Sequence, residues 1–236
     1  MRRRRWIIAA VVVAALLGAT TATAALAAPT VTAAACPQCY GLTARGGGLY
    51  SDRDDPAHRP MLDAADRRIA AFYGSRTVQP RILICTTGDC YRRIGGGGEK
   101  GRTIRTWALL LSPNGANETI ATHELSHGEF HQRLGSARDR VPQWFDEGLA
   151  VLVSDDARYL QAGRGEARCR LPLAEALPVV TTDWSAPTGG AVDHHYLQAG
   201  CVVAKWVDDN GGPAAVLDLI DRLRDGAAFE TAVTVG

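Results

Sequence analysis

The pattern that most constrains this chain is His123-Glu124-Leu125-Ser126-His127. Two histidines four residues apart lie on the same face of a helix, one turn from each other. A turn signal, Pro113-Asn114-Gly115, precedes the segment that contains them. We therefore expect a helix over residues 116–134 whose two imidazoles converge on one point.

Such a pair is suited to a metal ion, and zinc in particular binds neutral imidazoles and keeps one position open for water. Glu124 follows the first histidine, so it lies beside the pair without being a ligand. From there its carboxylate can take a proton from a water molecule that the metal polarises. His131 lies one turn beyond His127, roughly 6 Å further along the helix, so we expect it to be a neighbour of the site.

Glu147 stands twenty residues after His127, in the segment Pro142-Gln143-Trp144-Phe145-Asp146-Glu147-Gly148-Leu149-Ala150. With this segment, residues 116–154 resemble the gluzincin zinc metallopeptidases, especially the small peptidase-MA-like family. Their second helix carries Pro-x-Trp-x-x-Glu-Gly-hydrophobic-Ala. The resemblance implies that Glu147 is the third zinc ligand, beside His123 and His127. The aminopeptidase-N-like members have a spacing one residue shorter, which would select Asp146, but the flanking residues align Glu147 better.

The resemblance implies a zinc metallopeptidase that binds one Zn²⁺ and hydrolyses peptide bonds in a peptide or protein substrate. Glu124 would act as general base and then as general acid. A group on a later helix would stabilise the developing oxyanion, and here we favour Tyr196, with His195 second. Two alternatives remain: a non-catalytic zincin-fold binding domain at the cell surface, and an amidase acting on cell-wall peptides.

The N-terminus has the order of a secretory signal peptide. Four arginines, residues 2–5, precede an apolar stretch and then small residues around Ala27. We expect cleavage after Ala27, with Ala24 and Ala35 as alternative sites, and hence a secreted, extracytoplasmic protein. An uncleaved segment would instead anchor the chain in the membrane.

Removing residues 1–27 changes the charge balance. The remaining 209 residues carry 22 basic and 25 acidic side chains, a formal net charge of −3. A nucleic-acid-binding protein needs a basic face, so we expect no nucleic-acid partner, and we expect a monomer.

Six cysteines in an exported chain indicate disulfides, although six allow 15 connectivities. Cys85 and Cys90 flank a turn-like segment, residues 86–89, which favours a local bridge. For Cys36 and Cys39 a structural bridge is a better interpretation than a redox pair, because no strand–helix pattern follows them. Cys169 and Cys201 would then pair by elimination.

The expected fold is α+β and zincin-like: a small twisted sheet packs on the zinc-binding helix, and a mainly helical C-terminal subdomain follows. We divide the chain into a signal peptide (1–27), an N-terminal leader (28–60) and a metallopeptidase domain (61–236). The domain has an upper α/β part, residues 61–134, and a helical lower part, residues 135–236. Apolar periodicity predicts further helices over residues 61–73, 142–154, 195–208 and 213–224. Strands are predicted over residues 81–85 and 103–111, the second at the sheet edge.

Overall fold

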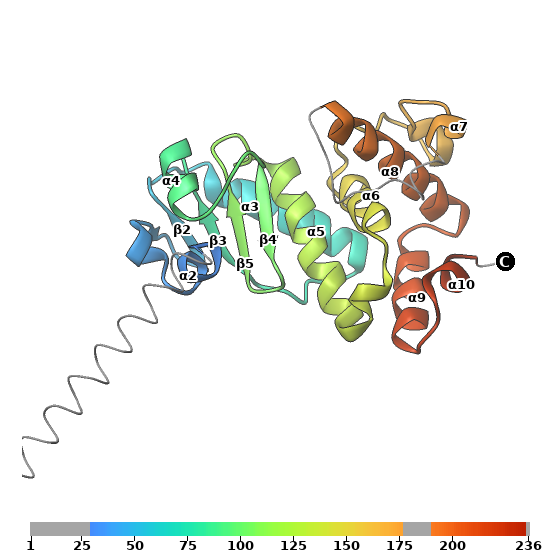
Figure 1. Ribbon diagram of the computed structural model, residues 1–236, viewed down its shortest axis with the longest axis horizontal. Coiled ribbons are helices and arrows are strands. Elements are labelled where there is room, and N and C mark those ends of the chain that lie inside the picture. The colour runs from blue at the N-terminus through green and yellow to red at the C-terminus, as the bar shows by residue number, and fades with distance from the viewer. Residues whose placement is uncertain (1–28, 177–189, 235–236) are drawn as a thin grey trace, which may run out of the picture.

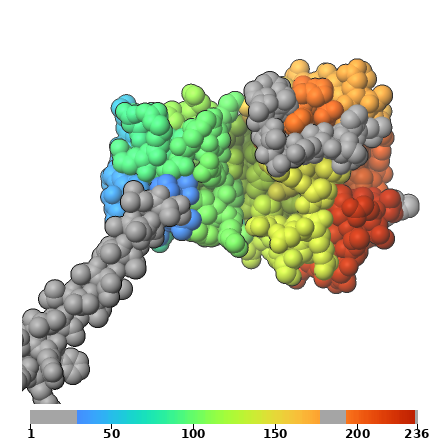
Figure 2. Space-filling view, viewed as in Figure 1, coloured from blue at the N-terminus to red at the C-terminus, as the bar shows by residue number. Residues whose placement is uncertain are grey.

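The computed structural model describes residues 29–176 and 190–234, so the predicted signal peptide lies outside the described residues. It shows an α+β protein in which a small mixed sheet and a group of C-terminal helices lie at opposite ends of the molecule (Figure 1). Figure 2 shows the same division by colour, with blue and green residues at one end and yellow to red residues at the other. The coarse fold class predicted from the sequence is therefore confirmed.

The sheet has five strands in the order β1-β2-β3-β5-β4, with β1 (Thr43–Ala44) and β4 (Gly101–Ile104) at its edges. Strand β3 (Arg81–Ile84) runs parallel to both of its neighbours, β2 (Leu49–Ser51) and β5 (Ala108–Leu111). Both edge strands are antiparallel to their neighbours. The segment expected as a leader thus supplies β1 and β2 to the same sheet.

The single strand predicted over residues 103–111 is wrong, because two strands of a hairpin replace it. Strand β4 ends at Ile104, and β5 begins at Ala108. The reversal takes place at Arg105, which has a left-handed φ of 51°, and the Trp107 N–H donates to the Ile104 carbonyl at 3.3 Å. Glycine or asparagine usually occupies such a left-handed position, so the sequence carried no turn signal here.

Alternating side chains of the central strands enter two different apolar layers, as the period of two in a strand requires. One face packs against α3 (His58–Tyr73) and α5 (Glu118–Leu134). The other is covered by α2 (Pro29–Ala35) and α4 (Gly88–Arg93). The first face presents Ile82, Ile84, Leu109 and Leu111, and the second presents Leu83, Ala108 and Leu110.

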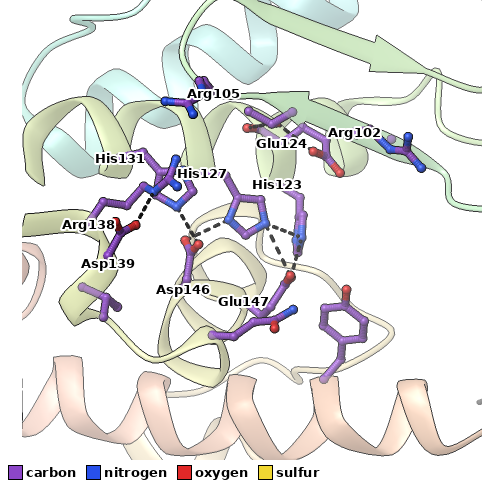
Figure 3. A pocket seen from close by; sticks show the side chains of 15 residues that line it. Arg102, Arg105, His123, Glu124, His127, His131, Arg138, Asp139, Asp146 and Glu147 are labelled. Atoms are coloured by element: carbon purple, nitrogen blue, oxygen red, sulfur yellow. Dashed lines mark hydrogen bonds and ion pairs between the residues drawn. The ribbon is translucent and has the colours of Figure 1, made fainter. Parts of the chain in front are cut away.

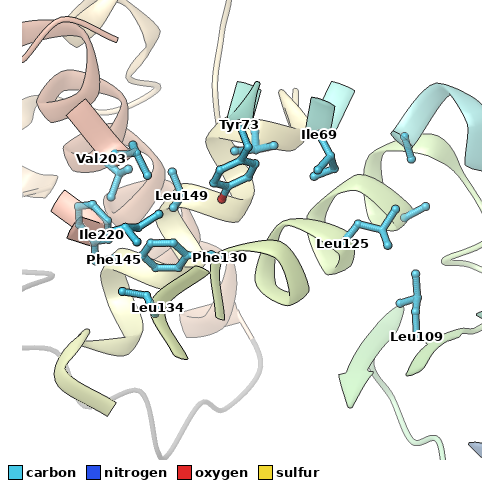
Figure 4. Close-up of a cluster of buried hydrophobic side chains, with 14 of the residues drawn as sticks. Ile69, Tyr73, Leu109, Leu125, Phe130, Leu134, Phe145, Leu149, Val203 and Ile220 are labelled. Carbon is cyan, nitrogen blue, oxygen red and sulfur yellow. The ribbon is translucent and has the colours of Figure 1, made fainter. Parts of the chain in front are cut away.

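The helical part follows α5. It contains α6 (Gln143–Ser154), α8 (Gly190–Asp209), α9 (Pro213–Arg224), α10 (Phe229–Val233) and the short α7 (Leu173–Ala176). Three 3₁₀ helices complete the described elements: η1 (Pro37–Tyr40), η2 (Gly135–Arg140) and η3 (Gly165–Arg168). Phe145 on α6 lies in the part of the core that the C-terminal helices form (Figure 4), with its ring centroid 5.3 Å from that of Trp206 and 5.2 Å from that of Phe229. This aromatic cluster fixes the rotation of α6 beside α5.

All six cysteines are bridged in the structure, as Cys36–Cys39, Cys85–Cys90 and Cys169–Cys201. The expected pairing is therefore confirmed; the segment between Cys85 and Cys90 bends at residues 86–87 and then enters α4 at Gly88. Among residues 29–176 and 190–234, none of the helices combines the length and the apolar character needed to cross a bilayer.

Candidate metal centre

Helix α5 carries the two histidines of the motif and is well defined at both ends. The Asn117 side chain accepts a hydrogen bond from the Ile120 N–H at 3.0 Å, which caps the first turn. Gly135 ends the helix in a conformation with positive φ. His123 and His127 point from α5 toward Glu147 on α6 (Figure 3).

Three side-chain atoms of these residues form a nearly regular triangle. The Nε2 atoms of His123 and His127 lie 3.2 Å apart. The Glu147 Oε2 atom lies 3.3 Å from the first and 3.5 Å from the second. Tetrahedral ligands about 2.0–2.1 Å from a zinc ion are separated by about 3.3–3.4 Å from one another. The triangle therefore has the size that three zinc ligands require.

The donor chemistry of the triangle also suits a cation. Glu147 Oε2 is buried, and no regular hydrogen bond reaches it within the part of the chain that the structure describes; its charged neighbours are the two Nε2 atoms at 3.3 and 3.5 Å. A buried oxygen in this state is costly unless a cation satisfies it. Two imidazole nitrogens and one carboxylate oxygen are ligands that zinc accepts, so these residues could hold a metal ion.

Asp146, the other carboxylate considered as a third ligand, contacts His127 and His131 and not the triangle. Its Oδ1 lies 2.8 Å from His127 Nδ1, and its Oδ2 lies 2.6 Å from His131 Nε2. Both ring nitrogens can donate to it, which leaves His127 Nε2 directed at the triangle. His127, His131 and Asp146 also lie close enough to form a second group that could hold a cation, but Asp146 uses both oxygens on the histidines.

Burial and charge shift the pKa values of these groups. Burial is the largest influence on His127 and lowers its pKa, but the carboxylates of Asp146 and Glu147 outweigh it and raise the pKa well above 6.5. Burial would raise the pKa of Asp146, yet the charge and hydrogen bonds of His127 and His131 lower it to about 2. The pKa of Glu147 is also lowered, because His127 and His123 outweigh its burial.

Glu124 faces strand β4 and lines the same cavity as the triangle. The Thr103 hydroxyl donates to its Oε2 at 2.8 Å and lies 2.7 Å from its backbone carbonyl. A Cβ at Gly101 would meet the Glu124 side chain at 2.7 Å, so this position of β4 accommodates no larger residue without displacing Glu124. The cavity has a volume of about 660 Å³.

The two candidates for the oxyanion are placed differently. Tyr196 lines the cavity, with its ring centroid 6.1 Å from that of His123 and stacked on Tyr159 at 5.1 Å. Burial, followed by the negative charge of Glu147, raises its pKa, so its hydroxyl keeps its proton at neutral pH. His195 is next to it on α8 but is not among the residues that line the cavity.

Gly148 is a packing position next to Glu147 whose role the sequence did not predict. A Cβ there would lie 2.4 Å from the carbonyl oxygen of Ala199 on α8. The glycine lets the backbones of α6 and α8 approach closely, and α8 carries Tyr196. The signal was present in the Glu-Gly pair, since a glycine inside a helical pattern often has a packing reason.

Comparisons of the chain with family models, with curated proteins and with solved structures found no match. The fold and the site define a class of protein: a disulfide-bonded α+β protein with a buried His/Glu group that could hold a metal ion.

Proposed function

We propose that the protein is an exported zinc-dependent peptidase of the gluzincin type, with a zincin-like fold. The observation that carries this proposal is the triangle of His123, His127 and Glu147, with edges of 3.2–3.5 Å. Glu124 lies on the wall of the same cavity, so a ligand set and a candidate base share one solvent-filled space.

When bound, zinc would polarise the carbonyl of the bond to be cleaved and lower the pKa of a water molecule. Glu124 takes the proton of that water and later delivers it to the leaving amine. Thr103, from β4, orients the Glu124 carboxylate through its hydrogen bond. The hydroxyl of Tyr196 stays protonated and can donate to the oxygen on which negative charge develops.

Strand β4 provides a place for the substrate main chain. It is an edge strand, and Gly101, Arg102 and Thr103 line the cavity. An extended peptide can add to such an edge through main-chain hydrogen bonds. This geometry supports hydrolysis of a peptide held in an extended conformation beside Glu124.

Two features support export, and a third concerns the partners of the protein. The N-terminal sequence has the order of a signal peptide. The three disulfides suit an oxidising compartment. The charge balance of residues 28–236 offers no basic excess for nucleic acid. We therefore propose an extracytoplasmic monomer, attached to a membrane only if the N-terminal segment stays uncleaved.

The test uses the protein expressed with its full sequence and loaded with zinc. Metal content is measured by mass spectrometry, and turnover is measured by digestion of a peptide library. The proposal expects one zinc per chain and cleaved peptides. Glu124→Gln should keep the zinc and lose turnover. Glu147→Ala should lose the zinc, whereas Glu166→Gln, an exposed control on η3, should change neither.

Each alternative has its own outcome. Protein that binds no stoichiometric zinc would contradict the proposal. Protein that holds zinc but cleaves no peptide would support a zincin-fold binding domain. Protein that cleaves only cell-wall peptides would support an amidase.

A further inference from the structure

The cavity continues on both sides of the metal centre. A second cavity of about 420 Å³ lies beside the first, and the two share residues of the site. The shared residues are Gly101, His123, Glu124 and Tyr196. A polypeptide can therefore extend in both directions from the bond beside Glu124, which is what a chain cleaved in its interior requires.

One end of this cleft carries two arginines that form no ion pair with a buried carboxylate among the described residues. Arg105, on the β4–β5 turn, and Arg138, on η2, both line the larger cavity (Figure 3). Within residues 29–176 and 190–234, the Arg105 guanidinium makes no hydrogen bond or ion pair. Arg138 has only the adjacent Asp139, at 3.4 Å, whose side chain is 86% exposed, and such a pair contributes little in water.

The buried carboxylates that line the same cavity, Asp146 and Glu147, are already engaged. Asp146 receives His127 and His131 on its two oxygens, and Glu147 faces the histidine pair. At this end of the cleft an acidic group of a ligand would therefore meet Arg105 without competition from a buried partner of the protein.

The opposite end is balanced. Lys100 and Arg158 line the second cavity, but so do Glu99 and Asp193. Arg158 is held by Asp156, with its Nε donating at 2.9 Å. Arg102, which lies nearer the centre, pairs with Glu99 at 2.7 Å. The charge of the cleft is thus asymmetric along β4.

The backbone at Arg105 gives a second, independent observation. Its φ of 51° is a conformation that residues other than glycine rarely adopt. The turn lies over α5, where a Cβ at Gly128 would be 3.8 Å from the Arg105 carbonyl oxygen. Unfavourable backbone conformations of this kind are concentrated at ligand-binding sites. Here the position is occupied by arginine, although glycine would adopt the same backbone conformation at a lower energy.

We infer that this cleft binds an interior segment of a polypeptide and that Arg105, with Arg138 beside it, selects an acidic side chain on its side of the cleaved bond. This inference rests on the proposed peptidase function. It assigns Arg105 as a residue that determines specificity and an Asp- or Glu-containing peptide as the preferred substrate.

The experiment measures peptide binding and cleavage separately. Zinc-loaded Glu124→Gln protein is titrated with fluorescent peptides that differ only by Glu or Gln at one position, scanned along the peptide. At one position we expect Glu to bind about fivefold more tightly than Gln, with the difference shrinking as salt is raised. Cleavage rates of the same peptides are measured with the unsubstituted protein.

Variants at Arg105 separate charge from folding. Arg105→Gly suits the left-handed backbone, so the protein should keep its melting temperature while the preference for Glu disappears. Arg105→Glu should reverse the preference. Arg164→Glu changes an arginine whose side chain is 90% exposed and which lines neither cavity, so it should retain the preference.

Equal binding of Glu and Gln peptides at every position would overturn the inference, as would a preference that survives in Arg105→Gly. A preference in binding without any cleavage by the unsubstituted protein would leave Arg105 assigned and refute the peptidase. Failure to bind any peptide would overturn both the assignment of Arg105 and the proposed peptidase function.

Discussion

Replacing Gly148 by alanine tests how the metal centre depends on the contact between α6 and α8. The added Cβ would lie 2.4 Å from the Ala199 carbonyl oxygen, 2.7 Å from Val203 Cγ2 and 2.8 Å from the Ala199 carbonyl carbon. Two of these three atoms belong to the backbone of α8, so a change of side-chain rotamer cannot remove the clash. The two helices must move apart by about 1 Å to restore ordinary contact.

Two opposing effects set the size of the change in the free energy of unfolding. Alanine is favoured over glycine inside a helix by about 1 kcal/mol. Overpacking of a well-filled interface typically costs about 1–3 kcal/mol, and here the upper part of that range applies because backbone atoms collide. We expect a net loss of about 1–2 kcal/mol in the free energy of unfolding. For a protein of this length that is a fall of about 2–8 °C in melting temperature.

Gly128 on α5 provides the matched control. It also lies inside a helix, one residue after His127, but a Cβ there would meet nothing closer than 3.8 Å. Gly128→Ala should therefore gain most of the helix preference and raise the melting temperature by about 2–4 °C. Both variants are measured by thermal and urea unfolding after chelation of metal, so that bound zinc does not mask the difference.

Zinc affinity gives a second measurement on the same variants. Gly148→Ala should weaken zinc binding, because the shift of α8 disturbs the packing beside Glu147, whereas Gly128→Ala should bind zinc normally. The reasoning is refuted if Gly148→Ala is as stable as the unsubstituted protein, or if both substitutions have the same effect on stability.

Four further predictions concern the site and the fold. Asp146→Asn should weaken zinc binding about 10–100-fold in a chelator competition, because it can no longer accept from both His127 and His131; Asp139→Asn, an exposed change in the same cavity, should leave the affinity unchanged. Serine at both Cys169 and Cys201 opens a bridge across 32 residues and should cost about 3–4 kcal/mol in denaturant unfolding; a loss below about 1 kcal/mol would contradict this. Acid should release zinc, since the ligating imidazoles must lose their protons to bind it, and zinc retained on dialysis at pH 5 would count against the assignment. In metal-free protein the raised pKa of His127 stabilises the fold below about pH 6.5, and this contribution is lost as the pH rises through the pKa of folded His127. The lowered pKa of Asp146 stabilises the fold above about pH 4, and this contribution is lost as the pH falls toward 2. The melting temperature of chelated protein should therefore be highest between about pH 4 and pH 6.5.

Local signals placed most of the helices well. The predicted helix over residues 213–224 coincides with α9, which has Gly212 before it and Pro213 at its first position. The histidine helix begins after Asn117 and ends before Gly135. Caps, glycine stops and apolar periodicity act within a few residues of one another, so they can be read from the chain alone.

The structural features that the sequence did not predict depend on packing between segments far apart in the chain. The β4–β5 turn depends on Arg105 in a left-handed conformation over Gly128, and no residue typical of turns marks it. The role of Gly148 became visible only when α8, some fifty residues later, was seen to contact it. The bond from His131 to Asp146 likewise joins two helices.

The residue spacing alone predicts that one helix presents two histidines on one face and that a carboxylate near the start of the next helix can approach them. Spacing alone allows either Asp146 or Glu147 as the third ligand, because adjacent residues on a helix differ by only about 100° in direction, and the flanking residues favour Glu147 through the resemblance. The tertiary structure directs them to different nitrogens: Glu147 Oε2 toward both Nε2 atoms, and Asp146 toward His127 Nδ1 and His131. The physical reason is the rotation of α6 about its axis, which the burial of Phe145 and the close approach at Gly148 set together.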